Sequence, residues 1–489
     1  MKLIRVHEDD NVAVALSEIE TGESLDLPWG GRLVAREGVP VSHKVAVTDI
    51  PAGRTIRRYG QPIGTAARDI FSGDWVHTHN LRSPDEIPPM TSRPESAAPA
   101  DLPAPDHFSG YARAKGPAGV RNHLLVMSTV ACANGVVRAI GRAVPQAVTI
   151  EHAHGCGRVG PDHERTQRVL SGAATHPNTG AVLLVGLGCE IVSGEAMHRE
   201  VAESGRPVEY LKIQDAGSRR TTEKGVELGR RLLSAIAGQA REPRPVSDLI
   251  LGLQCGGSDA LSGVTANPAV GLVSDWIVGY GGTVIMAETT EMIGTLHLLQ
   301  ARALDDQVAG EIQVIIAKNQ DLARKMLGEQ AHLAIAPGNM DGGLSSIMEK
   351  SLGCITKGGR TTIQEVVPYG RRPLRPGLAI MDTPGYDVES LGGLLGAGCQ
   401  ACLFTTGRGS PVGTPLMPVI KISSNTDAFR RMDGDIDVNA GEIADGRRGL
   451  EEMGRVLWEQ TMDVLAGRLS RAEENRQEVL GISMTIEAG

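Results

Sequence analysis

Short apolar runs alternate with polar, glycine-rich stretches through most of this chain. After Gly110, strand-like runs are followed by stretches with helical spacing, as in Val182–Gly186, then Glu195–Ser204, then Val208–Ile213. Such alternation is typical of a mostly parallel sheet with helices on its faces. The pattern therefore predicts an α/β body, which a helix over Arg447–Leu469 with amphipathic spacing would close.

The first 80 residues follow a different pattern. Short alternating segments such as His43–Ile50 are interrupted by Gly or Pro, which is typical of a small β domain. Seven prolines then fall between Leu81 and Pro105 among polar residues, and such a segment is expected to be an exposed, semi-extended linker. Together with a polar stretch near Arg241, these patterns predict four parts: a β domain at 1–80, a Pro-rich linker at 81–108, and α/β subdomains at 109–242 and 243–489.

Composition narrows the class of protein. Of the 489 residues, 41% are hydrophobic but only 3% are aromatic, so the core must consist of small aliphatic side chains. The net charge of −9 and the lack of a basic run argue against nucleic acid as a partner. No signal peptide and no apolar run long enough to span a bilayer is present, so we expect a cytoplasmic protein without membrane contact.

Four of the seven cysteines share a sequence context. Cys132, Cys156, Cys189 and Cys255 are glycine-flanked or glycine-near, and each follows a short apolar run. If the four runs are neighbouring parallel strands, the thiols gather at the carboxyl edge of one sheet, where open α/β sheets bind ligands. An isolated free cysteine is more often a small buried hydrophobe. Four in one context favour a metal or catalytic site.

Histidines lie in two patterns that suit metal binding. His77 and His79 are two residues apart at the end of the β domain, and on a strand both rings would point to one face. His154 precedes Cys156 by two residues, and imidazole with thiolate suits iron, zinc or copper. Solvated histidines at a domain edge, and a Gly-rich turn with incidental histidines, are the alternatives.

Two strand-end loops suit an anionic ligand. Gln254–Asp259 resembles a Gly-rich strand-to-helix turn, whose N–H groups attract carboxylate or phosphate, although it lacks the P-loop ending. Thr405–Ser410 follows another apolar run and carries Arg408, which can bind a carboxylate bidentately. A surface loop is the alternative for the second segment.

With these motifs, the chain resembles the altronate/galactarate dehydratase family of sugar-acid hydro-lyases over roughly residues 1–450. The motifs that carry the resemblance are His7–Leu16, His43-Lys44, Tyr59–Gly64, the pair His77 and His79, Gly110–Arg113, Gly119–Asn122, His-Gly-Cys-Gly at 154–157, Gly186–Glu190, Gln254–Pro268, Met381–Gly385, Phe404–Gly409 and Asn439–Gly446.

The resemblance implies an amino-terminal SAF domain, which has a β-clip fold, and dehydration of a sugar acid to a 2-keto-3-deoxy acid. It implies dependence on Fe²⁺ or a similar divalent ion such as Mn²⁺. A mononuclear iron is the favoured form, with an iron–sulfur cluster as the alternative, because the cysteine spacing matches no compact ferredoxin pattern. Altronate, galactarate and, in a lyase variant, sulfolactate are all possible substrates, and a non-catalytic sugar-acid sensor is a further alternative.

The hypothesis from the sequence assigns each candidate residue a role, in an expected homodimer that takes a small sugar acid. The expected catalytic groups are His43, Lys44, His154 and Asp259. The expected substrate-binding residues are Asn80, Arg121, Gly256, Gly257, Ser258, Asn267, Thr406 and Arg408. The expected metal ligands are His77, His79, Cys132, Cys156, Cys189 and Cys255.

Overall fold

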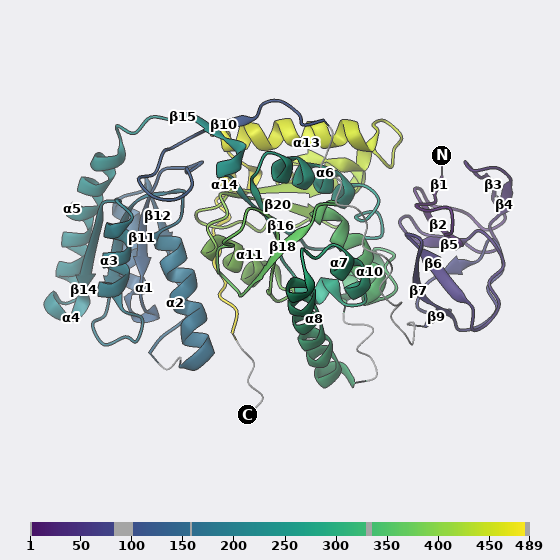
Figure 1. Ribbon diagram of the computed structural model, residues 1–489, viewed down its shortest axis with the longest axis horizontal. Helices are drawn as coiled ribbons and strands as arrows, with labels where there is room; N and C mark the ends of the chain where they lie inside the picture. Colours follow the sequence, from purple (N-terminus) through teal and green to yellow (C-terminus); the bar gives the residue numbers. More distant parts are fainter. Residues whose placement is uncertain (1, 83–100, 157–158, 329–334, 485–489) are drawn as a thin grey trace.

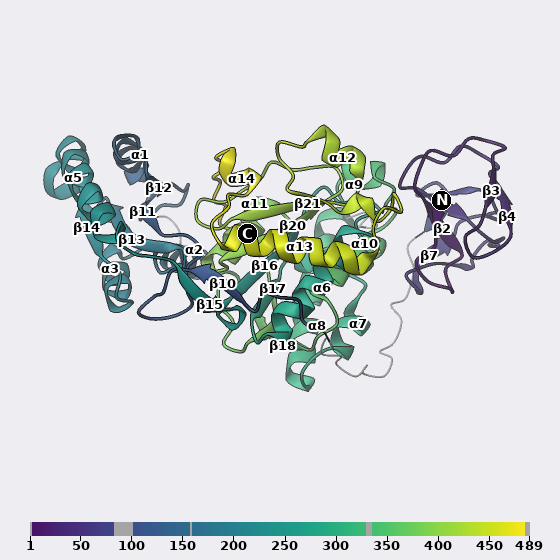
Figure 2. The ribbon, with the colours of Figure 1, turned by 90° about the horizontal axis from the view of Figure 1, so that it is seen from above.

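The computed structural model describes residues 2–82, 101–156, 159–328 and 335–484. Three domains lie in a row, with the third domain of the chain in the middle and the β domain at one end (Figures 1 and 2). A small β domain and a body of parallel sheets confirm the predicted α/β class. Among the described helices, none is long and apolar enough to cross a membrane.

The β domain contains three small antiparallel sheets, ordered β1-β2-β5-β8, β3-β4 and β6-β7-β9. Their alternating apolar residues fill two clusters of buried side chains, one of which also takes in Met348 and Leu352 of the third domain. The predicted linker falls largely on residues 83–100, outside the described residues. The strands are β1 (Leu3–Ile4), β2 (Val12–Ala15), β3 (Ser24–Asp26), β4 (Arg32–Val34), β5 (Lys44–Ala46), β6 (Thr55–Arg58), β7 (Gln61–Ala66), β8 (Trp75–Val76) and β9 (Leu81–Arg82).

The second domain is a four-stranded parallel sheet in the order β12-β11-β13-β14. Helices α1 and α5 cover one face, while α2 and α3 cover the other, which also packs against the third domain. Its elements are β11 (His123–Ser128), α1 (Asn134–Ala143), β12 (Ala147–Ile150), α2 (Gly160–Ala174), β13 (Thr179–Gly186), α3 (Gly194–Glu203), β14 (Val208–Lys212), α4 (Ile213–Ala216) and α5 (Ser218–Ile236).

The third domain is a seven-stranded parallel sheet in the order β18-β19-β17-β16-β20-β21-β22. Helices α6, α8 and α13 pack on one face and α11 on the other. The strands are β16 (Ile250–Cys255), β17 (Thr283–Met286), β18 (Ile363–Val367), β19 (Gly377–Met381), β20 (Ala401–Thr406), β21 (Val419–Ser423) and β22 (Val438–Asn439). The helices are α6 (Ala266–Gly279), α7 (Leu296–Ala301), α8 (Asp306–Leu327), α9 (Pro337–Asp341), α10 (Ile347–Cys354), α11 (Asp387–Gly396), α12 (Thr426–Arg431), α13 (Leu450–Leu465) and α14 (Arg471–Glu474).

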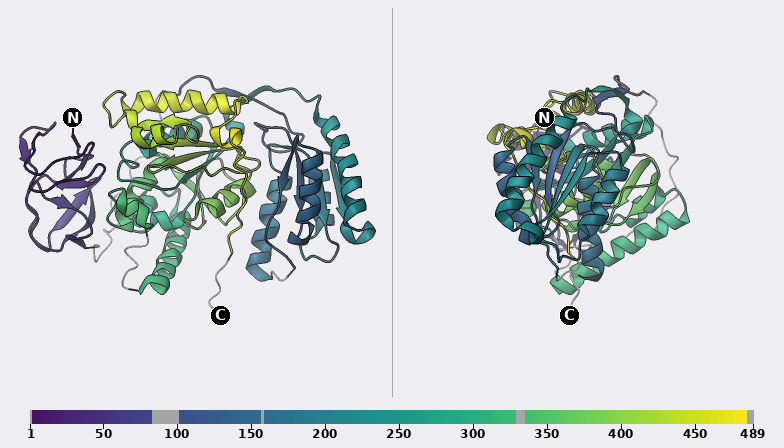
Figure 3. Two further views of the ribbon diagram at one scale, coloured as in Figure 1. Left: turned by 180° about the vertical axis from the view of Figure 1, so that it is seen from behind. Right: turned by 90° about the vertical axis from the view of Figure 1, so that its left-hand side faces the viewer.

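A two-stranded antiparallel ribbon joins the two α/β domains. Strand β10 (His107–Gly110) enters the second domain, and β15 (Glu242–Pro245), which leaves it, pairs with β10. The carboxyl-terminal helix α13, yellow in Figure 3, lies along the third domain against α6, where Trp458 meets Trp276 edge to face. This helix confirms the amphipathic segment expected near the end of the chain.

The strand order of the third domain reverses direction between β16 and β20, and the loops at this switch point are called the crevice below. From β16 the chain continues to β17 on one side, whereas from β20 it continues to β21 on the other, and β16 and β20 are direct neighbours. Such a reversal of direction opens a crevice outside the carboxyl ends of the two strands, and open α/β sheets bind their ligands there. The Gln254–Asp259 turn follows β16 and the Thr405–Ser410 loop follows β20, so both predicted anion-binding loops border this crevice.

Candidate functional site

The two crevice loops hold each other by backbone hydrogen bonds. The amide of Gly256 donates to the carbonyl of Thr405 at 3.1 Å, and the amide of Arg408 donates to the carbonyl of Gly257 at 2.9 Å. Gly257 has a φ of +61°, a conformation that glycine adopts without strain. The hydroxyl of Ser258 is buried and has no hydrogen-bond partner among the described residues, so it is free to bind a ligand.

A segment from α9 to Ser345 lies between this turn and the β domain. The side chain of Asn339 donates to the carbonyl of Ser258 at 2.8 Å. On the other side, His43 Nε2 lies 3.2 Å from the carbonyl oxygen of Asp341, and the Arg408 guanidinium lies 4.0 Å from the Asp341 carboxylate. The predicted clamp Arg408 and the predicted histidines therefore face the same segment, with Arg408 about half exposed.

Three histidines surround Trp75 on the β-domain side. Its indole stacks on His77 with centroids 5.6 Å apart, lies 5.1 Å from His79, and donates its N–H to His43 Nδ1 at 3.1 Å. The strand ends at Val76, and His77 begins a turn that Asn80 stabilises. The expectation that both histidines lie on one strand is therefore wrong, although both rings meet at Trp75.

Hydrogen bonds constrain the rings of His43 and His77. His43 accepts a hydrogen bond from the Trp75 indole at Nδ1, so its Nε2–H donates to the carbonyl of Asp341 and the ring is neutral. His77 shares a hydrogen bond with Ser345 Oγ through Nδ1 at 3.1 Å, which leaves Nε2 for a ligand. Burial, together with the nearby Lys44 ammonium, lowers the pKa of His77 to about 3.

A buried ion group fastens the β domain to α10. Lys44 donates to Glu349 at 3.0 Å, to Ser345 and to the carbonyl of Gly343, and Arg58 donates to the other Glu349 oxygen at 2.6 Å. Burial lowers the pKa of Lys44 to about 8. Burial alone would raise the pKa of Glu349, yet the two cations outweigh it and hold that pKa at about 2. All three hydrogens of the Lys44 ammonium are therefore engaged.

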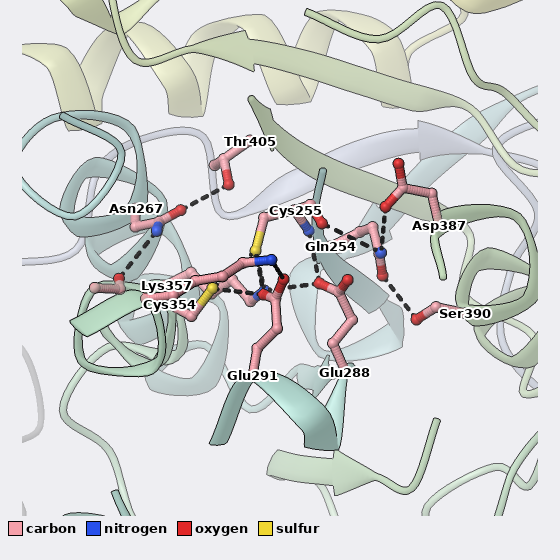
Figure 4. Close-up of polar contacts among 12 residues, drawn as sticks. Gln254, Cys255, Asn267, Glu288, Glu291, Cys354, Lys357, Asp387, Ser390 and Thr405 are labelled. Carbon is pink, nitrogen blue, oxygen red and sulfur yellow. Dashed lines mark hydrogen bonds and ion pairs between the residues drawn. The ribbon is translucent and has the colours of Figure 1, made fainter. Parts of the chain in front are cut away.

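Beneath the crevice, two thiols share one carboxylate oxygen (Figure 4). Cys255 and Cys354 donate to Glu291 Oε2 at 2.7 and 2.6 Å, and their sulfur atoms lie 3.0 Å apart. All three residues are buried and their ligand atoms lie within 4.8 Å of one another. This donor set fits a soft divalent metal, whose binding would displace the thiol protons.

Charged side chains complete this buried cluster. Lys357 donates to Cys255 Sγ at 2.9 Å and to Glu288 at 3.2 Å, and Lys350 binds Glu291 at 2.6 Å. Burial and the neighbouring Glu291 raise the pKa of Glu288 to about 8. Glu288 has a φ of +69°, which is strained for a residue other than glycine, and its Oε1 has no hydrogen-bond partner among the described residues. Strain of this kind, with a shifted pKa, is characteristic of functional sites.

Asp387 brings a second carboxyl group to the crevice. It begins α11, and its carboxylate lies so close to Gly256 that a Cβ at that position would collide with it. Gln254, which also contacts Ser390, donates weakly to Asp387 at 3.4 Å. Burial raises the pKa of Asp387 to about 6. Asp387 therefore combines a crevice position with a pKa suited to proton transfer near neutral pH.

Several predicted residues support the crevice without facing it. The Asp259 carboxylate accepts hydrogen bonds from Ser262, Ser424 and Asn425. The Asn267 amide bridges Thr405 and the carbonyl of Gly353, and the Thr406 hydroxyl accepts from the Gly409 amide. Asn80 likewise binds the backbone of Trp75 and His77.

The predicted four-cysteine edge is divided between two sheets. Cys132, Cys156 and Cys189 follow the neighbouring strands β11, β12 and β13 and are exposed. Cys255 ends β16 of the seven-stranded sheet and is buried. The expectation of a single sheet is therefore wrong for Cys255, because its apolar run begins a separate sheet.

Two further predicted residues lie away from the crevice. His154 belongs to the second-domain edge, where its carbonyl accepts from the Ala131 amide at 2.8 Å and its own amide donates to His152 Nδ1. The Arg121 guanidinium binds Glu473 at 2.8 and 2.9 Å and the carbonyls of Val464 and Arg468. Arg121 thus fastens the carboxyl-terminal segment to the second domain.

Sequence reasoning missed Glu288, Glu291, Cys354 and Glu349. The two glutamates follow the apolar run Val284–Met286, so the strand-end argument applied to every strand would have found them. Cys354 and Glu349 lie on α10, and no local pattern indicates that this helix meets both the crevice and the β domain.

Comparison with known proteins finds a family match for each of the three domains. Residues 246–487 match the family described as D-galactarate/Altronate dehydratase, C-terminal; residues 110–237 match its second domain, and residues 1–84 match the altronate/galactarate dehydratase SAF domain.

Individual relatives agree with these family matches. The chain is 35% identical to altronate dehydratase of Bacillus subtilis over 98% of both chains, and 35% identical to galactarate dehydratase (L-threo-forming) of Escherichia coli over 95% of this chain and 93% of that one. It is 31% identical to (2R)-sulfolactate sulfo-lyase subunit beta of Chromohalobacter salexigens over 75% of this chain and 94% of that one. The chain belongs to the altronate/galactarate dehydratase family.

Proposed function

We propose that the protein is a metal-dependent dehydratase that removes water from a sugar acid, an aldonate such as altronate or an aldarate such as galactarate, and forms a 2-keto-3-deoxy acid. The observation that carries this proposal is the crevice at the β16–β20 switch point. It joins an anion-binding turn, an arginine and two carboxyl groups of raised pKa, and the β-domain histidines lie across from it. Full-length similarity to relatives named altronate and galactarate dehydratase supports the reaction class.

The substrate carboxylate would bind between Arg408 and the turn at Gly257. Arg408 presents a guanidinium that matches a carboxylate in shape and charge. The free hydroxyl of Ser258 supplies a further polar contact at the same place. The substrate's carboxyl end would thus be fixed with its C2 and C3 atoms near Asp387.

Asp387 and Glu288 suit the two proton transfers. With a pKa of about 6, Asp387 is mostly ionised at neutral pH and would take the C2 proton. With a pKa of about 8, Glu288 is mostly protonated and would supply the proton with which the 3-hydroxyl departs as water. The resulting enol then tautomerises to the 2-keto acid. We assign His43 and Lys44 a positioning role, since their polar hydrogens are already engaged.

His77 and His79 would hold the metal at the crevice. When Nδ1–H of His77 donates to Ser345 Oγ, Nε2 is the ring nitrogen left to bind a metal, and metal-bound histidines in proteins typically donate their other ring N–H in this way. Neutral imidazoles suit iron and similar divalent ions. When bound, the ion would stabilise the negative charge that develops on the substrate as the C2 proton leaves.

The exposed thiols of Cys132, Cys156 and Cys189 form a separate candidate for iron, as a mononuclear ion or an iron–sulfur cluster. Free cysteine is among the residues most often buried, so three exposed thiols after neighbouring strands favour a ligand role. Iron and acid-labile sulfide would be measured in the Cys132→Ser/Cys156→Ser/Cys189→Ser variant and in His77→Ala. Loss of iron in the first variant alone would assign the metal to the second domain, and loss in the second alone would assign it to the crevice.

The test of the function is an anaerobic assay of the Fe²⁺-loaded protein against aldonates, aldarates and sulfolactate, scoring 2-keto acid and sulfite. We expect a 2-keto-3-deoxy product from a sugar acid, its loss on chelation, and its loss in His77→Ala. The matched control is His107→Ala, an exposed histidine on β10, which should retain activity. Sulfite release without dehydration of any sugar acid would contradict the proposal and favour the lyase reaction.

A further inference from the structure

A cavity of about 820 Å³ lies between the second and third domains, away from the crevice. Its walls come from α2, the end of α3, the segment Gly370–Arg372 after β18, and the end of α11 at Gly396. Figure 1 shows α2 on the side of the second domain that faces the third domain. A volume of this size is typical of sites for small metabolites.

The lining of this cavity is strongly cationic. Five basic side chains contribute to it: Lys115, Arg168, Arg206, Arg371 and Arg372. Its acidic side chains are Glu200 and Glu203, which are both exposed at the end of α3. Among the described residues, none of the five cations makes an ion pair with a carboxylate. The lining therefore has a positive excess, with five basic and two acidic side chains.

Backbone carbonyls, not carboxylates, hold the arginines in place. Arg168 donates to the carbonyl of Tyr369 at 2.8 Å, and Arg372 donates to that of Ala397 at 3.1 Å. Arg206 is buried and donates to the carbonyl of Thr179 at 2.9 Å and to Ser204 at 2.8 Å. These contacts fix the guanidinium groups without pairing any of them directly with a carboxylate.

Like charges also lie close to one another in this cavity. Burial, followed by the charge of Arg372, lowers the pKa of Arg206 to about 10. Burial also lowers the pKa of Arg168; the nearby Glu164 carboxylate opposes this shift, whereas Arg371 and Arg165 act in the same direction as burial. Holding cations together without an anion is unfavourable, and a bound anion would relieve this repulsion.

Close backbone contacts define the shape of the cavity. A Cβ on Gly172 of α2 would collide with the carbonyl oxygen of Gly396, so the two helices meet without side chains between them. Arg372 packs closely against Gly398, where a Cβ would collide with its guanidinium. The cations of the two domains are thus held at a fixed separation across the cavity.

We propose that this cavity binds a small metabolite that carries at least two phosphate or carboxylate groups. Arginine forks match both kinds of anion bidentately. Cations from both domains line the cavity, so a ligand with two anionic groups can contact both domains at once. The net charge of −9 makes attraction of anions by the protein as a whole an unsuitable explanation for binding here.

The experiment uses the full chain with inorganic pyrophosphate and citrate as probes at about 150 mM salt, where diffuse attraction is largely screened. Binding would be measured by calorimetry and by the shift in melting temperature. The test variant is Lys115→Gln/Arg371→Gln, because both side chains are exposed and their loss should leave the fold intact. The control with the same charge change is Arg220→Gln/Arg230→Gln, two exposed residues of α5.

We expect saturable binding of pyrophosphate or citrate, weakened roughly tenfold or more in the test variant and unchanged in the control. Preference between the two probes distinguishes a phosphorylated ligand from a polycarboxylate. Equal affinity in both variants, or no binding of any probe to the wild type, would overturn the proposal. Arg168→Gln, which removes a different wall of the cavity, provides a second test if the first variant unfolds. Dehydratase activity without added anion should not change in any of these variants.

Discussion

The carboxyl edges of the two parallel sheets share a sequence pattern, a cysteine at the end of an apolar run, but differ in solvent exposure. In the second domain, the cysteines that follow β11, β12 and β13 are exposed. In the third domain, Cys255 follows β16 and is buried with Cys354, Glu291 and Lys357. The difference arises because α10 and the β domain cover the second of these edges, whereas no described element covers the three thiols of the first.

The comparison shows that the chemistry available at a sheet edge depends more on whether other elements bury that edge than on the strand-end motif itself. The covered edge combines a sealed polar layer with a crevice in which carboxyl groups acquire raised pKa values. The open edge leaves thiols in water, where they can bind a metal but cannot exclude solvent from a reaction. We therefore place the substrate at the third-domain crevice and treat the second-domain edge as a separate site.

The largest effect should come from removing the crevice arginine. Arg408→Ala should lower kcat/KM for 2-keto acid formation by roughly 10²- to 10³-fold, because a positioned cationic donor is lost from the substrate carboxylate. The matched control is Arg430→Ala, an exposed arginine on α12. Comparable activity in the two variants would show that the substrate does not bind at the β16–β20 loops.

Breaking the buried ion group of Lys44, Arg58 and Glu349 should weaken the attachment of the β domain to α10. Glu349→Gln leaves Lys44 and Arg58 buried without their carboxylate, and such a loss costs about 3–5 kcal/mol. Glu227→Gln, which breaks the exposed pair with Lys224, should lower the stability far less, because solvent screens such a pair. Urea unfolding of both variants measures the contrast. Equal losses would mean that the buried group does not fasten the β domain.

Acid should weaken the junction between the second and third domains. His176 is wholly buried, donates from Nε2 to the carbonyl of Cys399 and accepts at Nδ1 from Asn178. Burial lowers its pKa to about 3. Since the unfolded chain takes up the proton near pH 6.5, the stability from this group is complete above that pH and is lost as the pH falls towards 3, by up to about 1.4 kcal/mol per unit.

The measurement for this prediction is urea unfolding at pH 7.5 and pH 5. The difference between the two pH values should shrink in His176→Gln and should be unchanged in His198→Asn, which alters a partly exposed histidine of α3. An unchanged pH difference in His176→Gln would contradict the assignment of the acid sensitivity to this residue.

The smallest expected effect is a difference in labelling rate between the exposed and the buried thiols. A thiol reagent added to the folded, metal-free protein should modify Cys132, Cys156 and Cys189 rapidly, since they are exposed. Cys255, Cys354, Cys399 and Cys402 should react only on unfolding. Mass spectrometry of the labelled peptides identifies the sites. Fast labelling of Cys255 would show that the layer beneath the crevice is open.

Most of the architecture could be predicted from the sequence because it depends on local patterns. Alternation of apolar runs with helical spacing gave the α/β body, and frequent turn residues gave the β domain. The division into two α/β subdomains was predicted from the polar stretch near Arg241, yet the hypothesis of one cysteine edge assigned Cys255 to the first sheet, because the run before Cys255 resembles the run before Cys189. Which strands become neighbours is decided by packing between distant segments.

The candidate site was predicted where it consists of loops that follow strands, as at Gly256–Ser258 and Arg408. It was missed where the partner lies on a helix or at a domain contact. Glu349 and Cys354 differ by five positions on α10, yet one binds the β domain and the other binds Cys255. Such roles depend on tertiary contacts that no single-sequence pattern encodes.

The most direct test of the account compares the two sheet edges during ligand binding. Hydrogen–deuterium exchange would be followed in the metal-loaded Asp387→Asn variant, with and without the sugar acid identified in the assay. We predict slower exchange in residues 254–262, 404–410 and 75–81, and no change in residues 128–134 and 187–192. Protection confined to the second-domain segments would contradict the placement of the substrate at the crevice.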